Sequence, residues 1–232
     1  LKVPAILNQG SYGESRFLTL GPIDMSHPPK YDSMPAELIV SIAEIFNINK
    51  THNSIGSTNL WHRLLEANRS DVLVRKVFKS IGPIEKLSEI PIGLAHRDFV
   101  FWNISVDSNT VSILDWEWAE SSHIPLQDLY HYYLHGAVNA MESTPMEQAL
   151  RIFFRSPSKI VAPIKRYMNA TGVQHSHSWK LFVLYLSDWI LLQHEIGNSD
   201  THQVKGYRLL LDKILSDDSL SEDHWLAGAL KN

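Results

Sequence analysis

The sequence contains no cysteine among its 232 residues. This absence excludes disulfide bridges, a thiol nucleophile and thiolate metal sites, and it is typical of a reducing compartment, so we expect a cytoplasmic protein. Basic residues are also few, because 21 Lys and Arg stand against 25 Asp and Glu, a formal net charge of -4. No basic cluster offsets that charge, so binding to nucleic acid or to an anionic membrane surface is not expected.

Long apolar runs are scarce as well. The longest, residues 181–192, is interrupted by Ser187 and Asp188 and is too short to span a bilayer. No signal peptide opens the chain. Hydrophobic residues at 44% and charged residues at 20% describe an ordinary soluble globule without disorder. The first residue is Leu and not Met, so we expect the sequence to begin inside a longer natural protein.

One stretch carries the residues of a recognisable chemistry. Asp98 is followed, after four intervening residues, by Asn103, and a second aspartate, Asp115, lies further along the chain. Phosphoryl transfer from ATP needs this set of groups. Asp98 would accept or orient the proton of an attacking hydroxyl, while Asn103 and Asp115 would supply hard oxygen ligands for Mg²⁺.

A short hairpin is predicted between the two proposed metal ligands. Apolar residues alternate with polar ones on both sides of an Asp-Ser-Asn turn at 107–109, which is typical of two antiparallel strands. The apolar residues expected to pair are Ile104 and Val106 with Val111 and Ile113. This pairing would return Asp115 to the side of Asn103. The alternative is an ordinary Asp-rich turn region with a solvated carboxylate, which the added strand–turn–strand pattern makes less favourable.

Residues 93–134 resemble the catalytic and metal loops of the aminoglycoside phosphotransferase and choline kinase group, relatives of protein kinases. That group typically has His-Gly-Asp, then Asn, then Asp-Trp-Glu or Asp-Phe-Glu, then Pro-Leu-x-Asp-Leu. The corresponding residues here are His96-Arg97-Asp98, Asn103, Asp115-Trp116-Glu117 and Pro125-Leu126-Gln127-Asp128-Leu129. Arg97 departs from the small-molecule pattern toward the protein-kinase one, but the Asp-Phe-Gly and Ala-Pro-Glu motifs of protein kinases are not found.

The resemblance implies an α+β, protein-kinase-like fold, mainly its mostly helical C-terminal lobe with a small β remnant of the N-terminal lobe. Residues 1–21 would form a residual hairpin and hinge, and residues 22–232 the catalytic lobe. It also implies ATP and Mg²⁺ as cofactors. The partner would be a small-molecule hydroxyl acceptor such as an aminoglycoside, an amino alcohol or a sugar.

The N-terminal hairpin admits two interpretations. Strands at residues 3–7 and 17–20 are predicted around a glycine-bearing turn at 8–15, which is either a phosphate-covering glycine loop or the last hairpin before the hinge. We favour the hinge, because a glycine loop should be followed by a strand with a phosphate-pairing Lys. The nearest candidate, Lys30, follows two prolines that disfavour a central strand.

On the hinge interpretation, the resemblance implies that Thr19, Leu20, Gly21 and Pro22 present backbone groups to the adenine. The glycine loop, its Lys and the helix Glu that pairs with this Lys would then be absent from this sequence. That absence supports an alternative function of a different class: an inactive, pseudokinase-like module that binds nucleotide or acts as a scaffold.

Helical periodicity accounts for most of the remaining chain. Thr144-Pro145-Met146-Glu147 is a typical helix start with a capping box, and residues 179–196 are apolar on nearly every face, which indicates a buried central helix ending at Gly197. The helices predicted are residues 35–47, 60–67, 71–81, 126–141, one beginning at 145, 159–169, 179–196, 204–215 and 222–230.

An aromatic cluster close to two glutamates suggests a cage for a cationic substrate, in which Glu117, Trp118 and Glu120 would bind the acceptor. The aromatic residues concerned are Trp116, Trp118, Tyr130, Tyr132 and Tyr133. The alternative is simple core packing, which we favour.

Two further groups of residues have structural and metal-binding interpretations. His131 and His135 lie four residues apart on a predicted helix, a spacing that can bind zinc, but no carboxylate lies between them and zinc is not expected. His96, Arg97 and Asp128 are expected to support the catalytic loop. Asp128 would either cap the helix that follows or hold the loop by hydrogen bonds.

Overall fold

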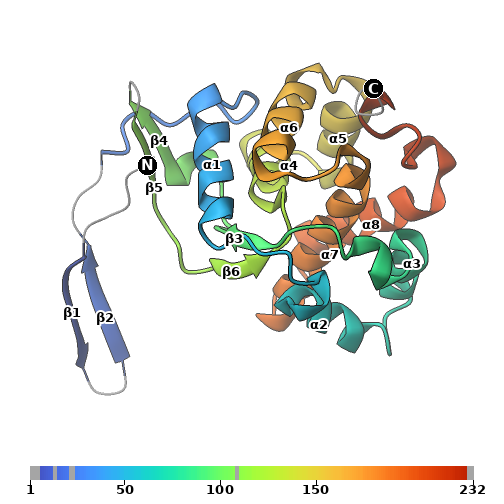
Figure 1. Ribbon diagram of the computed structural model, residues 1–232, viewed down its shortest axis with the longest axis horizontal. Coiled ribbons are helices and arrows are strands. Elements are labelled where there is room, and N and C mark those ends of the chain that lie inside the picture. The colour runs from blue at the N-terminus through green and yellow to red at the C-terminus, as the bar shows by residue number, and fades with distance from the viewer. Residues whose placement is uncertain (1–5, 13–14, 21–23, 108–109, 229–232) are drawn as a thin grey trace.

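The computed structural model describes residues 6–12, 15–20, 24–107 and 110–228 (Figure 1). This part of the chain is α+β: helices predominate, and the strands form three separate two-stranded sheets. None of its helices combines the length and the apolar character that a bilayer crossing requires. The α+β class predicted from the sequence is therefore confirmed.

The first sheet is the antiparallel hairpin of β1 (Ile6–Tyr12) and β2 (Ser15–Leu20), which Figure 1 shows to one side of the helices. Its strands are longer than predicted, because Gly10 pairs with Phe17 and pairing continues to Tyr12 and Ser15. The expected eight-residue turn at 8–15 is therefore wrong: glycine is tolerated in a two-stranded ribbon and did not end the strand. Residues 3–5 of the first predicted strand lie outside the described residues.

Helix α1 (Ala36–Ile48) is amphipathic and buries its apolar face, as predicted for residues 35–47. It packs against β3 (Gly93–Ala95) and against α6 (Ser158–Thr171). The connector before it lies along residues 104–107, since the Val106 amide donates to the His27 carbonyl at 2.9 Å. Helix α1 thus packs against the strand that leads into residues 96–98.

Helices α2 (Asn59–Ala67) and α3 (Val72–Ile81) begin at side-chain caps. The Thr58 hydroxyl accepts from the Trp61 amide, and the Asp71 carboxylate accepts from the Leu73 amide. Such caps satisfy amide groups that the first helical turn leaves without partners. Both helices confirm the sequence prediction, and both pack on α7 (Ser178–Glu195).

The ribbon of β4 (Ile104–Asp107) and β5 (Thr110–Ile113) has the predicted register, with Ile104 opposite Ile113 and Val106 opposite Val111. A third sheet was not predicted. It pairs β3 with β6 (Glu120–His123), so that Ala95 faces Glu120. Both of its strands are short, and Glu-Ser-Ser-His has no alternation of apolar and polar residues to mark it as a strand.

The C-terminal half is helical. It consists of α4 (Gln127–Ala140), α5 (Pro145–Ala149) with a π-helical turn at Leu150–Arg155, α6, α7 and α8 (His202–Ser216). The capping box at Thr144 and Glu147 is present as predicted. The helix expected at 222–230 is wrong within the described residues, where only 3₁₀ turns at Asp218–Leu220 and Trp225–Gly228 occur. Among residues 222–226, whose burial the structure describes, Trp225 and Leu226 are buried, too few for a helical apolar stripe.

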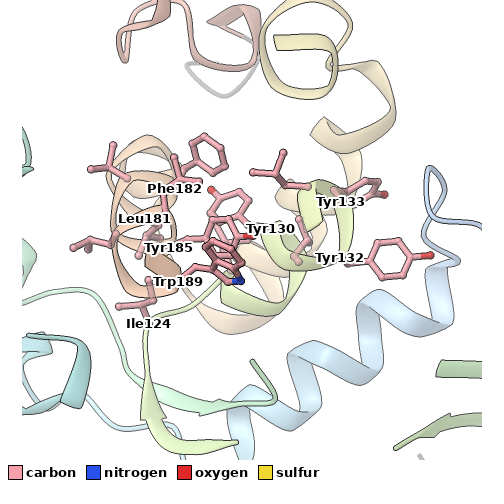
Figure 2. Packing of buried hydrophobic residues seen from close by; sticks show 14 of the residues in the cluster. Ile124, Tyr130, Tyr132, Tyr133, Leu181, Phe182, Tyr185 and Trp189 are labelled. Atoms are coloured by element: carbon pink, nitrogen blue, oxygen red, sulfur yellow. The ribbon is translucent and has the colours of Figure 1, made fainter. Parts of the chain in front are cut away.

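An aromatic core joins α4 to α7 (Figure 2). The Tyr130 ring on α4 packs edge-on against Phe182 on α7, with ring centroids 5.2 Å apart, and Tyr185 lies 5.9 Å away. All three side chains are fully buried. Because aromatic pairs of this geometry add to the free energy of burial, α4 is firmly held by the central helix, and the loops that depend on α4 inherit that rigidity.

Gly93 offers a test of how tightly β3 packs on α1. A Cβ at this position would lie 2.3 Å from the Phe46 carbonyl oxygen, so Gly93→Ala must force β3 away from α1. We expect it to lower the free energy of unfolding by about 1–3 kcal/mol, the usual cost of overpacking. Urea denaturation followed by circular dichroism measures the change.

The matched control is Gly136→Ala, in the interior of α4. There the nearest atom, Cδ1 of Phe101, would be 3.5 Å away, an ordinary contact. This substitution should stabilise the protein by up to about 1 kcal/mol, because Ala is favoured over Gly inside a helix. Equal effects at the two positions would contradict the packing described for β3.

Candidate active site

The candidate catalytic loop, residues 96–103, is attached to α4 by the Asp128 carboxylate. Its Oδ2 accepts from the His96 amide at 2.9 Å, and its Oδ1 accepts from the Arg97 amide at 2.8 Å. Asp128 lies in the first turn of α4 and is 7% exposed, whereas the residue at the helix cap is Leu126. Of the two roles considered from the sequence, holding the loop by hydrogen bonds is the one observed.

Two residues of the site have left-handed backbone conformations that are costly for residues other than glycine. The φ angle of Arg97 is 71° and that of Asp115 is 62°. Such conformations cost on the order of 1–3 kcal/mol, persist only where the surroundings enforce them, and cluster at functional sites. At Arg97 the enforcing contacts are the bond to Asp128 and the ion pairs of its own side chain. The strain therefore marks both loops as candidates for function.

Asp98 is held between two other side chains. Its Oδ2 accepts from the Asn103 amide nitrogen at 2.9 Å, and its Oδ1 lies 3.4 Å from Nε2 of His131. Burial raises the pKa of Asp98, but the hydrogen bond and charge of His131, with the smaller effects of His135 and His96, outweigh it, so the net pKa lies below its ordinary value. With 29% of its side chain exposed, Asp98 is an ionised carboxylate that a solute can reach.

The two predicted metal ligands lie at the same end of the β4–β5 ribbon. The Leu114 amide donates to the Asn103 carbonyl at 2.9 Å, which brings Asp115 next to Asn103. The amide nitrogen of Asn103 is used on Asp98, so its Oδ1 is left to act as an acceptor. Asp115 is exposed, and in the described part of the chain no hydrogen bond or ion pair engages its carboxylate.

The side-chain oxygens of Asn103 and Asp115 fit Mg²⁺ as two of its ligands. An amide oxygen and a carboxylate are the hard ligands that Mg²⁺ prefers, and Mg²⁺ is commonly held by one or two such groups together with phosphate and water oxygens. Among the described residues there is no group of three or more His, Cys, Asp or Glu side chains able to hold a metal alone. A site of this kind would accordingly bind the ion together with a nucleotide phosphate.

His96 joins the catalytic loop to the metal loop. Its Nε2 lies 2.7 Å from the Leu114 carbonyl, an acceptor, which assigns the proton to Nε2. The ring packs edge-on against Trp116, with centroids 4.6 Å apart. His96 is fully buried. These contacts suit the supporting role expected of it and leave no access for a substrate.

A buried cluster of five ionisable side chains lies beneath the loop. Asp188 on α7 is fully buried and accepts from Arg97 at 2.8 Å, from Arg63 at 2.5 Å and from His123 at 3.2 Å. Glu120 pairs with both arginines. Burial raises the pKa of Asp188, but His123, Arg97 and Arg63 together lower it well below the ordinary value. The cluster therefore holds two carboxylates opposite two guanidinium groups.

Sequence reasoning missed this cluster, although one signal was available. Asp188 interrupts a helix that is apolar on every face, and a carboxylate in such a place must be paired. The pairing also gives Glu120 two structural partners, Arg63 and Arg97. Acceptor binding remains a prediction for Glu120, for Glu117, which is exposed, and for Trp118, which is half-buried.

The three tyrosines of the aromatic cluster are packed in the core, which is the interpretation favoured from the sequence over a cage. Tyr130, Tyr132 and Tyr133 are buried at 0%, 0% and 2% exposure, and the Tyr132 hydroxyl donates to the Lys30 carbonyl at 2.7 Å. Residues 127–134 of α4 are all buried, so the three rings are enclosed although they point to different sides of the helix. They are therefore not available to a cationic ligand.

The histidine pair on α4 is stacked instead of converging on a metal. The rings of His131 and His135 are 4.5 Å apart at 17°. Burial, with a contribution from His131, lowers the pKa of His135 to about 3 in spite of the opposing charge of Asp98. His135 is therefore neutral at physiological pH.

Two of the four predicted adenine-binding residues lie at the end of the N-terminal hairpin. Thr19 and Leu20 are the last residues of β2 and pair with β1, while Gly21 and Pro22 lie outside the described residues. The hinge role of all four remains a prediction.

In comparisons with models of known protein families, with curated proteins and with solved structures, the chain has no match. Its function is therefore inferred from its own residues and their geometry.

Asp188→Asn tests the buried cluster. Removing the Asp188 charge leaves Glu120 as the one carboxylate of the cluster opposite two guanidinium groups, so we expect the free energy of unfolding to fall by about 3–5 kcal/mol at pH 7. Because the folded-state pKa of Asp188 is lowered, its stabilisation is present above the pKa of an unfolded aspartate, about 3.9, and is lost as the pH falls below it.

The control is Asp212→Asn, which removes an exposed pair with Lys76 at 2.7 Å. It should cost no more than about 1 kcal/mol. Urea denaturation at pH 7 compares the two variants, and a loss at Asp188 as small as that at Asp212 would rule out a strongly coupled cluster.

Proposed function

We propose that this chain is the catalytic lobe of a small-molecule kinase, which transfers the γ-phosphoryl group of ATP to a hydroxyl group of a small acceptor. One observation carries the proposal. Asn103 donates to the Asp98 carboxylate through its side-chain nitrogen, which leaves its side-chain oxygen as an acceptor, and Asp115 lies at the same end of the ribbon as Asn103. A hydroxyl-orienting carboxylate thus stands beside a pair of oxygen ligands suited to Mg²⁺ and phosphate.

The reaction assigned to these residues is a single displacement. The acceptor hydroxyl hydrogen-bonds to Asp98, its oxygen forms a bond to the γ-phosphorus, and the bond from that phosphorus to the bridging oxygen breaks, so that ADP leaves with the electron pair. The hydroxyl proton passes to the Asp98 carboxylate. Asn103 and Asp115 would hold Mg²⁺, whose charge would neutralise the phosphate oxygens. Catalysis of this type depends mainly on positioning and electrostatics.

The lowered pKa of Asp98 decides how it acts. A carboxylate of low pKa is a weak base, so it is poorly suited to removing a proton from a free hydroxyl in advance. It is well suited to orienting the hydroxyl and to receiving the proton as the oxygen–phosphorus bond forms, because only then does the hydroxyl become acidic. Its ionised state at neutral pH follows from the hydrogen bond and charge of His131, which outweigh burial.

A second candidate is an inactive nucleotide-binding or scaffold module. It is favoured by one observation: within the described residues, the strands β1 and β2 carry no Lys that could pair with the phosphates. The protein expressed from the complete gene discriminates between the two candidates. Mg·ATP binding without turnover, across a panel of aminoglycosides, amino alcohols and sugars, would support the module and refute the kinase.

Asp115→Asn tests the metal ligand. Asn is preferable to Ala here because φ is 62°, a conformation that Asn adopts at lower cost. Loss of the charge should weaken Mg²⁺-dependent nucleotide binding by at least the ~10–100-fold that changing even an outer-shell partner of a metal costs. A fluorescence titration of a nucleotide analogue, with and without Mg²⁺, measures this. Exposed Glu117, changed to Gln, is the matched control and should retain the Mg²⁺ effect.

Equal nucleotide affinity with and without Mg²⁺, in both the wild type and Asp115→Asn, would count decisively against the assignment of Asp115 as a ligand.

Asp98→Asn tests the catalytic carboxylate. The change preserves size and an acceptor for Asn103 but removes the charge and the affinity for a proton. We expect kcat to fall by about 10²–10⁴-fold, as is typical on loss of a positioned acid or base, while nucleotide affinity hardly changes. Steady-state kinetics of the complete protein give the measurement. Asp200→Asn, at a fully exposed aspartate, is the control and should leave kcat unchanged.

If turnover persists in Asp98→Asn at the wild-type rate, the mechanism assigned to Asp98 is wrong even if the protein is a kinase.

A further inference from the structure

A buried histidine lies directly behind Asp98 and has no role in the mechanism described so far. His131, on α4, is 2% exposed, and its Nε2 lies 3.4 Å from Oδ1 of Asp98. That nitrogen has no well-formed hydrogen bond to any described residue, so the Asp98 carboxylate is the polar group it faces. The other ring nitrogen, Nδ1, lies 3.5 Å from the Tyr185 hydroxyl on α7. His131 is thus placed between a core tyrosine and the candidate catalytic carboxylate.

The partners of His131 assign its tautomer. A neutral imidazole has one N–H donor and one acceptor nitrogen. An acceptor lone pair on Nε2 would face the negative Asp98 oxygen and be repelled, whereas an N–H there is attracted. Tyr185 is compatible with this tautomer, because burial raises its pKa well above the ordinary value and its protonated hydroxyl can either donate or accept at Nδ1. The structure therefore favours the tautomer in which Nε2–H points at Asp98.

The histidine that stacks on His131 adds no positive charge beside this donor. His135 stacks on His131 and is itself neutral, with its Nδ1 3.3 Å from the Tyr207 hydroxyl on α8. The groups that face the pair are Asp98 from the loop, Tyr185 from α7 and Tyr207 from α8. An N–H on Nε2 can therefore orient the Asp98 carboxylate, whose pKa lies below its ordinary value, so that it stays ionised and able to receive a proton.

Asp98 is consequently oriented from two independent elements. Asn103, in its own loop, donates to Oδ2, and His131, on the helix behind, faces Oδ1. Two donors on different oxygens define the plane of the carboxylate, whereas one donor would leave it free to rotate. Each oxygen retains a lone pair for a further donor, and the exposed part of the side chain is where an acceptor hydroxyl can approach.

We propose that His131 is a positioning residue for phosphoryl transfer: its Nε2–H holds Oδ1 of Asp98 so that the carboxylate faces the hydroxyl of the acceptor. This role rests on the proposed kinase function. The 3.4 Å separation is long for a hydrogen bond, and contacts of this kind tighten when substrate is bound.

Two substitutions distinguish positioning from packing. His131→Leu removes the donor at similar volume, and His131→Gln keeps an N–H at similar reach. In the protein expressed from the complete gene, we expect His131→Leu to lower kcat by about 10–100-fold, the effect of a misplaced catalytic group, with little change in KM for ATP. His131→Gln should recover most of that loss. A purely structural role predicts that both variants lose activity in parallel with their thermal stability.

A double-mutant cycle with Asp98→Asn gives the second kinetic test. If His131 acts only through Asp98, then adding His131→Leu to Asp98→Asn should lower kcat no further, since residues that act as a unit are strongly non-additive. Independent, multiplicative losses would overturn the proposal, as would wild-type kcat in His131→Leu.

A spectroscopic test does not depend on turnover. Long-range ¹H–¹⁵N correlation spectra of the same protein should show His131 as the Nε2–H tautomer at neutral pH. Asp98→Asn should shift its Nε2 resonance and leave the resonances of exposed His202 unchanged. A Nδ1–H tautomer, or no response to Asp98→Asn, would overturn the contact itself.

The two levels of failure are distinguishable. Absence of acceptor-stimulated turnover in the wild type would overturn the proposed function and, with it, the positioning role. Wild-type turnover that His131→Leu leaves intact would overturn the role of His131 alone.

Discussion

The geometry of the candidate site depends on two hydrogen bonds, those that the Asp128 carboxylate accepts from the amides of His96 and Arg97. Each oxygen of one buried carboxylate binds one peptide group, so the backbone before Asp98 is fixed to the first turn of α4. A buried amide without a partner costs about 1–3 kcal/mol, and here two would be left together. The left-handed conformation of Arg97 is maintained by this arrangement.

Arg97 then links backbone geometry to side-chain electrostatics. With its amide bound to Asp128, its guanidinium group points down to Asp188 and Glu120. The neighbouring Asp98 is correspondingly turned toward Asn103, His131 and the solvent. Consecutive residues thus serve opposite purposes, one anchoring the loop in the interior and the other presenting a carboxylate at the surface. A glycine, as found at this position in the resembling group, could adopt the same φ freely but could not reach the buried aspartate.

Much of the fold could be predicted from the sequence because the signals concerned are local. The register of the β4–β5 ribbon follows from alternation on both sides of a turn, and the helices follow from apolar periodicity and from caps such as Thr144. The pairing of β3 with β6 could not be predicted in this way, since strands so short and polar have no local signature. The predicted helix at 222–230 does not form in its described part, where residues 222–226 bury two side chains and 3₁₀ turns occur instead.

The candidate site was predictable in its residue types and not in its surroundings. Asp98, Asn103 and Asp115 belong to one short stretch with recognisable spacing, and a local hairpin brings them together. Asp188 and Arg63 reach the loop from helices far away in sequence. Apolar periodicity shows Asp188 only as a charged residue inside an apolar helix and Arg63 only as an ordinary polar residue, and it predicts no contact between them. His131 was identified by its spacing to His135, a pattern typical of metal ligands, whereas its partner is the carboxylate of Asp98.

The buried cluster also sets an order in which the protein can be assembled during synthesis. Arg97 and Asp188 are separated by 91 residues, and Arg63 and Asp188 by 125. Ribosomes add about 5–20 residues per second, so the two arginines and Glu120 emerge several seconds before the aspartate that neutralises them. Until α7 has left the ribosome and docked, the segment that contains Asp98 lacks its interior anchor. The catalytic loop is therefore among the last parts of the molecule to acquire its native form, although it lies in the first half of the chain.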